Sequence, residues 1–112
     1  MTNTRDEIPS GTLDMLILRT LARGAEMHGF EIADAIQQAS EDVLRVEEGS
    51  LYPALQRMLI KGWMVGEWGR TLGNRRARYY SITRAGRRQL AAETASWAGT
   101  VSIVNRMLQN KS

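Results

Sequence analysis

The chain has no cysteine and only one histidine among its 112 residues. Without cysteine it can form no disulfide and offers no thiolate to a metal ion or to nucleophilic catalysis. The single histidine, His28, lacks the companion ligands of a zinc site, so we expect it to begin a helix rather than to bind a metal. A glycine-rich phosphate loop is also missing, and we therefore expect neither an enzyme nor a bound cofactor.

Long apolar runs are absent as well. No segment approaches the length of a transmembrane helix, and the first ten residues, MTNTRDEIPS, contain no apolar signal core. Apolar residues make up 43 % of the chain and there are only two prolines, which is the composition of an ordinary globular protein. We expect a soluble cytoplasmic protein of one domain that does not associate with a membrane.

Positive charge is concentrated in one part of the sequence. Residues 1–56 hold four basic and ten acidic side chains, whereas residues 57–88 hold nine basic side chains and one acidic one, Glu67. Such a block is either a solvated surface or a binding surface for a polyanion, and composition alone leaves both interpretations open. The mutual repulsion of these cations favours a polyanion, either a nucleic-acid backbone or an anionic membrane surface.

Apolar residues recur at helical spacing in four segments, which predicts helices over residues 10–23, 29–39, 49–61 and 84–108. Ser10 and Thr83 are suitable caps for the first and the last of these helices. Pro53 lies inside the third segment, and proline is compatible with a helix mainly in its first turn. We therefore expect the third helix to begin close to Gly49 or Ser50, with Ser50 as its cap.

Between the third and fourth predicted helices the pattern changes toward a period of two. Residues 63–69 and 77–82 are rich in aromatic and β-branched side chains, and the loop between them contains glycine, asparagine and arginine. This pattern predicts a β-hairpin with Arg75 and Arg76 at its tip. We expect its tryptophans to pack within the hairpin rather than to stack on bases.

Three helices followed by a basic hairpin form the element order of a winged helix-turn-helix, so the predicted fold is mainly α with a small β-hairpin. A helix fits the major groove of DNA, and an adjacent hairpin can bring arginines to phosphates or into the minor groove. We expect residues 1–83 to form this DNA-binding domain and residues 84–112 to form a dimerisation helix within the same compact unit.

Two alternatives use the same charge pattern. The fold could serve protein contacts instead of DNA, and the basic block could bind a membrane surface. The membrane alternative is disfavoured because most of the arginines lie on the hairpin and the following cap, not on one amphipathic helix with bulky apolar side chains.

Four segments resemble the PadR family of bacterial transcriptional regulators, namely HGFEI at 28–32, GSLYPALQRM at 49–58, KGWM at 61–64 and ARYYSITRAGRRQL at 77–90. The resemblance covers nearly the whole chain and implies a homodimeric repressor that binds an inverted-repeat operator in double-stranded DNA. The short C-terminus resembles the smaller class of the family, which has a single dimerisation helix. Leu59 and Ile60 depart from the family pattern, which usually has acidic or polar residues there, and their role is open.

The candidate DNA contacts lie on the third helix and the hairpin. They are Ser50, Tyr52, Pro53, Gln56 and Arg57 on the helix, and Arg75, Arg76 and Arg78 on the hairpin. Tyr52 is offset by about a hundred degrees from Leu51, which lies on the core face, so its ring can reach a ligand. Two alternatives stay open, because Tyr52 can also be a core aromatic and Arg57 can also pair with a neighbouring acid.

The last predicted helix contains a heptad seam, whose positions are Leu90, Thr94, Trp97, Val101, Val104 and Leu108. A seam of this length exceeds what the core of so small a domain covers, so we expect it to pair with a second copy of the chain. The segment ETASWAGTVSIVNRML resembles the last helix of drug-sensing PadR members, in which a tryptophan stacks on flat aromatic ligands between subunits. This resemblance implies a small aromatic effector at Trp97, whereas its plainer role is to anchor the dimer.

Overall fold

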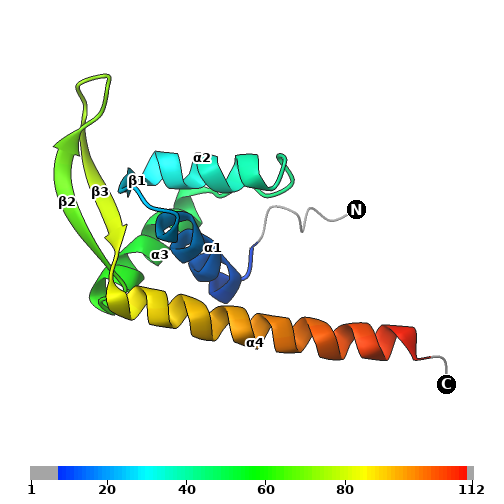
Figure 1. Cartoon of the computed structure of the whole chain (residues 1–112). Coiled ribbons are helices and arrows are strands. Elements are labelled where there is room, and N and C mark those ends of the chain that lie inside the picture. Colours follow the sequence, from blue (N-terminus) through cyan, green and yellow to red (C-terminus); the bar gives the residue numbers. More distant parts are fainter. Residues whose placement is uncertain (1–7, 111–112) are drawn as a thin grey trace.

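A computed structural model of the chain describes residues 8–110. Its elements, in chain order, are α1 (Ser10–Ala22), β1 (Met27–His28), α2 (Gly29–Ala39), α3 (Glu48–Ile60), β2 (Met64–Arg70), β3 (Arg76–Ile82) and α4 (Arg84–Gln109). Figure 1 shows a body made by the first three helices, a hairpin of β2 and β3 that projects from it, and α4 along its lower side. The predicted fold class, mainly α with a small hairpin, is confirmed.

The core forms around α1, which contacts α2, α3, β3 and α4. Its buried side chains are Leu13, Ile17, Leu18 and Leu21. They pack with buried residues of the other elements, which are Ile32, Ile36, Leu51, Ala54, Leu55, Met58, Met64 and Tyr80. Burial of each large aliphatic side chain contributes about 1.5–3 kcal/mol relative to leaving it exposed, so this cluster is the main support of the fold.

The sheet has three antiparallel strands in the order β1–β3–β2. Alternation along β2 places Met64, Gly66 and Trp68 on one face of the sheet. Met64 is buried near the start of β2, whereas Trp68 is exposed farther along, so the face that covers the core continues outward as a free surface. The two-residue strand β1 was not predicted, because a segment this short shows no alternation.

The long helix α4 begins as part of the body and then leaves it. The Thr83 hydroxyl accepts a hydrogen bond from the Gly86 amide at 3.0 Å, so the predicted cap is confirmed. Leu90 packs partly against the core, but every side chain from residue 94 to 110 is exposed. Figure 1 shows the C-terminal half of α4 extending past the other helices, and the chain measures 60 × 36 × 21 Å.

Three predicted details of the helices are wrong. Ser10 is the first residue of α1, and Pro9 occupies the cap position instead. The start of α3 lies at Glu48, so Pro53 falls in the second turn and Ser50 is not the cap. The carboxylate of Glu48 favours the earlier start, since an acidic group in the first turn interacts well with the helix dipole.

Within residues 8–110, no helix combines the length and hydropathy that crossing a membrane requires.

Candidate functional site

The exposed side of α3 carries the polar and aromatic residues predicted to meet a ligand. Leu51, Leu55 and Met58 are buried and fix the orientation of the helix. Tyr52 and Gln56, one turn apart, are consequently exposed. Pro53 is exposed beside them, where its missing amide costs α3 only the hydrogen bond to the Gly49 carbonyl.

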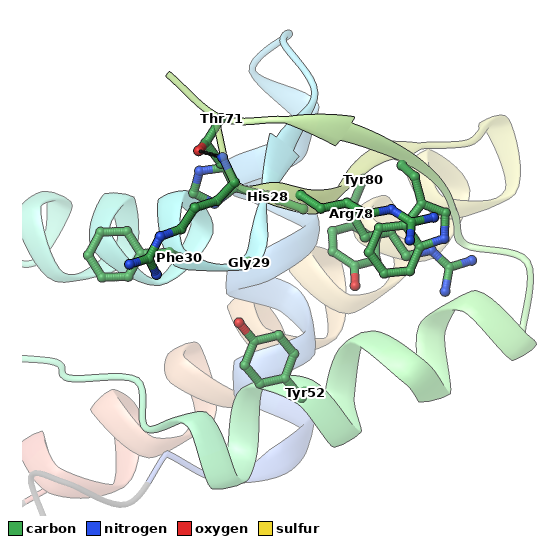
Figure 2. A pocket seen from close by; sticks show the side chains of 11 residues that line it. His28, Gly29, Phe30, Tyr52, Thr71, Arg78 and Tyr80 are labelled. Carbon is green, nitrogen blue, oxygen red and sulfur yellow. Dashed lines mark hydrogen bonds between the residues drawn. The ribbon is translucent and has the colours of Figure 1, made fainter. Parts of the chain in front are cut away.

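Tyr52 borders a groove between the helices and the β2–β3 hairpin, which we call the wing. This helix–wing groove encloses about 700 Å³, and its main lining residues are His28, Phe30, Tyr52, Trp68, Arg76 and Arg78. Figure 2 shows Tyr52 rising from α3 toward the start of α2, while Arg78 and Tyr80 come from the wing. A Cβ on Gly29 would lie 3.1 Å from the Tyr52 ring, so glycine at this position lets the ring pack closely against α2.

The wing presents an aromatic ring between arginines on the face that borders the groove. Trp68 pairs directly across the strands with Arg78 and is 61 % exposed. The Arg76 guanidinium carbon lies 4.6 Å from the Trp68 ring centroid, and that of Arg78 lies 6.0 Å from it. A ring stacked on guanidinium groups leaves the edges of those groups free to donate hydrogen bonds. Trp68 therefore packs against side chains of the hairpin itself, which agrees with the prediction that the hairpin tryptophans pack there.

Arg78 has unused hydrogen-bonding capacity. Its Nε atom is buried and has no hydrogen-bond partner within the described part of the chain. Gly66 allows the Arg78 side chain to pack against the β2 backbone, because a Cβ there would lie 2.7 Å from the Arg78 Nε atom. Burial raises the pKa of the neighbouring Tyr80 hydroxyl, an effect that the Arg78 cation opposes, so Tyr80 stays a neutral donor beside the groove.

His28 closes the floor of the groove and caps α2, as predicted. Its Nδ1 atom accepts a hydrogen bond from the Glu31 amide at 3.3 Å, and the His28 amide donates to the Glu31 carboxylate at 3.1 Å. This reciprocal arrangement is a capping box. Phe30 follows in the first turn of α2 and is 73 % exposed.

Arg57 faces away from the groove. Its Nη2 atom lies 2.6 Å from Asp14 Oδ1, and this ion pair joins α3 to α1. Burial raises the pKa of Asp14, while the hydrogen bond and the charge of Arg57 lower it part of the way back. The alternative in which Arg57 pairs with an acid is the one that the structure shows. Its partner lies 43 residues away, so no local spacing could have identified it.

The remaining candidate residues divide between two surfaces. Arg75, Arg76 and Arg78 line the helix–wing groove opposite Tyr52, and within residues 8–110 none of these arginines pairs with a carboxylate. Ser50 is exposed on the side of α3 where Arg57 lies, away from Tyr52. The groove thus combines an exposed helix face, three free cations and an aromatic ring, which is the chemistry that binds a nucleic-acid backbone.

The predicted seam is exposed along most of α4. Leu90 faces the core, whereas Thr94, Trp97, Val101, Val104 and Leu108 face outward. Trp97 is 51 % exposed and lies in a shallow hollow of about 610 Å³, which Val101, Asn105 and Arg106 also line. In the described residues, no group of three or more histidine and carboxylate side chains could hold a metal ion.

Comparisons with known proteins agree with this geometry. Residues 17–92 match the model of the transcriptional regulator PadR-like family. An uncharacterised protein of Lysinibacillus sphaericus is 27 % identical over 105 residues, which are 94 % of this chain and 95 % of that protein.

Solved structures are similar over nearly the full length. A PadR-like transcriptional regulator of Bacillus cereus has 30 % identity and a TM-score of 0.75, with 90 % of this chain and 95 % of that one covered. A transcriptional regulator of Clostridium thermocellum has 26 % identity and a TM-score of 0.80, with 88 % and 95 % covered. A PadR family regulator of Clostridium difficile has 28 % identity and a TM-score of 0.73, with 86 % and 97 % covered.

Proposed function

Since the chain belongs to the PadR-like family of transcriptional regulators, we propose that it is a repressor that binds an inverted-repeat operator as a homodimer. In this proposal residues 1–83 bind DNA and residues 84–112 form the dimerisation helix. The exposed face of α3 enters the major groove, where Tyr52 and Gln56 meet base edges and the neighbouring backbone. The wing arginines bind phosphates beside it.

The observation that best supports DNA as the ligand is that α3 and the wing face each other across the helix–wing groove. Arg76 and Arg78 are held against Trp68, and the buried Arg78 Nε atom lacks a partner within the described residues. Within residues 8–110 neither guanidinium group pairs with a carboxylate, so their outer edges can donate charge-assisted hydrogen bonds to phosphate oxygens.

The direction of α4 supports the proposed dimer. Gly86 and Leu90 lie on the stripe that packs against the chain's own body, and the same stripe continues through Trp97, Val101 and Val104 without cover from residues 8–110. A second copy related by a twofold axis would cover this stripe and would also present a second α3 to the other half-site.

The test is to compare two kinds of variant on DNA that the wild type selects from a random oligonucleotide pool. Arg75→Ala combined with Arg76→Ala should weaken binding to all sequences and reduce the salt slope by about two, because each lost phosphate contact removes about one unit. Gln56→Ala and Tyr52→Ala should instead reduce the preference for the selected sequence over random DNA. If the double arginine variant kept the wild-type affinity and salt slope, the wing would not be a DNA contact.

The proposal also includes a binding site for a small aromatic effector at Trp97. The exposed indole, which lines a shallow hollow, supports this site. Flat aromatic compounds bound there should quench tryptophan fluorescence saturably. Trp97→Ala should abolish the quenching while the dimer persists. Quenching that survives in this variant, or a variant that dissociates into monomers, would favour Trp97 as a dimer anchor.

A further inference from the structure

The tip of the wing exposes a leucine completely. Leu72 lies in the turn between β2 and β3, and its side chain is as accessible as in an extended chain. Tips of solvated hairpins are ordinarily polar, with asparagine, glycine and serine preferred for their turn geometry. The turn here has these residue types at Gly73 and Asn74, so turn geometry does not require the leucine.

Hydrogen bonds hold this tip in one shape. The Thr71 amide donates to the Arg75 carbonyl at 2.8 Å, and the Asn74 amide donates to the Thr71 carbonyl at 2.9 Å. The Thr71 hydroxyl accepts from the Arg75 amide at 3.2 Å, and Asn74 adopts a φ of 64°, a conformation that asparagine tolerates. Leu72 is therefore presented to solvent from a defined turn and does not depend on a mobile loop for its exposure.

The charges around Leu72 indicate its partner. Arg70, Arg75 and Arg76 surround the tip, while the one acidic residue of the wing, Glu67, belongs to the opposite sheet face from Trp68. A purely apolar protein surface would leave the surrounding arginines without partners, and a second wing would repel them because it carries the same charge. Neither is therefore a good partner for Leu72. An apolar side chain ringed by cations suits the DNA minor groove, which offers apolar sugar and base edges between two rows of phosphates.

The reach of the wing fits this partner. Its two strands have seven residues each, which gives strands of about 23 Å at about 3.3 Å per residue, and Leu72 lies at the end away from the buried Met64. With α3 in a major groove, the wing would cross one backbone strand at Arg76 and Arg78 and bring Leu72 to the adjacent minor groove.

We propose that Leu72 is a specificity-determining wedge that enters the minor groove, favours A·T steps there and bends the operator. This inference rests on the proposed DNA-binding function. An apolar side chain cannot pair with the amino group that guanine places in the minor groove, so G·C pairs at that step are disfavoured. Inserting an apolar wedge partly unstacks a base step and bends the duplex, most easily at pyrimidine–purine steps such as TA.

The experiment uses the full chain and a duplex that the wild type selects from a random pool. Leu72→Ser should lower the affinity for this duplex on the order of tenfold, as expected for one large apolar contact, and should reduce the bend measured by energy transfer between dyes at its ends. The salt slope should stay at the wild-type value, because no charge is removed. Leu72→Phe, a larger wedge, should retain the bend, and Val43→Ser, another exposed apolar loop position, is the matched control and should bind like the wild type.

A second arm locates the contact. Replacing adenine by 2,6-diaminopurine adds an amino group in the minor groove only, so a scan along the duplex should find positions where the wild type loses affinity. Leu72→Ser should be insensitive at those positions. Thermal unfolding of both proteins checks the fold, which an exposed tip residue should not affect.

The outcomes separate the two proposals. If the wild type enriches no sequence and binds all duplexes alike, the proposed function is wrong, and the wedge with it. If the wild type discriminates but Leu72→Ser matches it in affinity, bend and diaminopurine sensitivity, only the wedge is wrong. A loss of self-association in Leu72→Ser with unchanged DNA binding would also overturn the wedge, because the tip would then contact a second copy.

Discussion

Arg57 and Asp14 form the one ion pair that joins two helices of the body in residues 8–110, at 2.6 Å between Nη2 and Oδ1. Asp14 lies in α1 among Leu13, Ile17 and Leu18, where an unpaired carboxylate would be costly. The pair therefore stabilises the position of α3 relative to α1, and Arg57 acts on DNA binding only through that position. This is why Arg57 is unsuitable as a test of DNA contacts.

Arg57→Ala should destabilise the fold by about 1–3 kcal/mol, since it leaves a buried charged acceptor without its donor. The measurement is denaturant unfolding followed by circular dichroism. Ser50→Ala, an exposed position on the same helix, is the control and should change the free energy of unfolding by less than about 0.5 kcal/mol. Equal values for the two variants would show that the ion pair has no structural role.

The cost of Arg57→Ala should depend on pH. Burial raises the pKa of Asp14, so its contribution to stability is present below the pKa of the unfolded state and is lost as pH rises through the folded pKa. Removing Arg57 removes the two largest influences that lower this pKa, so ionisation becomes more costly. The destabilisation caused by Arg57→Ala should be larger at about pH 7 than at about pH 4. When Asp14 is also replaced by asparagine, this difference between the two pH values should disappear. The same destabilisation at both pH values would contradict the assignment.

At the scale of elements, two glycines of α4 occupy opposite environments. A Cβ on Gly86 would overlap the carbonyl oxygen of Trp63, whereas a Cβ on Gly99 would meet nothing within 4 Å. Gly86 therefore sets how closely α4 approaches the start of β2. Gly99 lies on the opposite side of the helix from the Trp97–Val101 stripe and only lowers helix propensity.

Gly86→Ala should destabilise the chain by several kcal/mol, on the order of the larger core substitutions, because backbone must move to admit the methyl group. Gly99→Ala should stabilise α4 by up to about 1 kcal/mol. Thermal unfolding of the two variants beside the wild type measures both effects. A Gly86→Ala protein as stable as the wild type would mean that the junction of α4 and β2 is looser than the structure indicates.

At the scale of the whole molecule, the exposed stripe of α4 is the largest departure from a self-contained domain. Exposed apolar surface of this kind usually marks an interface. Trp97, Val101, Val104 and Leu108 are all accessible in the single chain, so a second copy would bury them together.

Val101→Asp should convert the proposed dimer into monomers, because it places a charge at the centre of the buried stripe. Sedimentation equilibrium at micromolar concentration measures this directly. Thr100→Asp changes the neighbouring position off the seam and should leave the dimer intact. A wild-type chain that sediments as a monomer would refute the dimer, and so would a Val101→Asp variant that stayed dimeric.

Properties that depend on neighbours along the chain could be predicted from the sequence. Apolar periodicity gave the four helices, alternation gave the wing, and the hydroxyl of Thr83 gave the start of α4, since each is set by residues a few positions apart. The clustering of cations in residues 57–88 also depends only on the sequence, and the polyanion surface that it favours stays a prediction. The boundary of α3 was missed because the favourable placement of Glu48 competed with the local rule for Pro53.

Properties that depend on distant residues were decided only by the tertiary structure. The pairing of Arg57 with Asp14 joins positions in different helices, and the pairing of Trp68 with Arg78 depends on the register of two strands. The exposure of Phe30 and Leu72 depends on what the rest of the fold leaves uncovered. Helix periodicity states which residues share a face, but only packing decides whether another element covers that face, and so which residues stay free for a ligand.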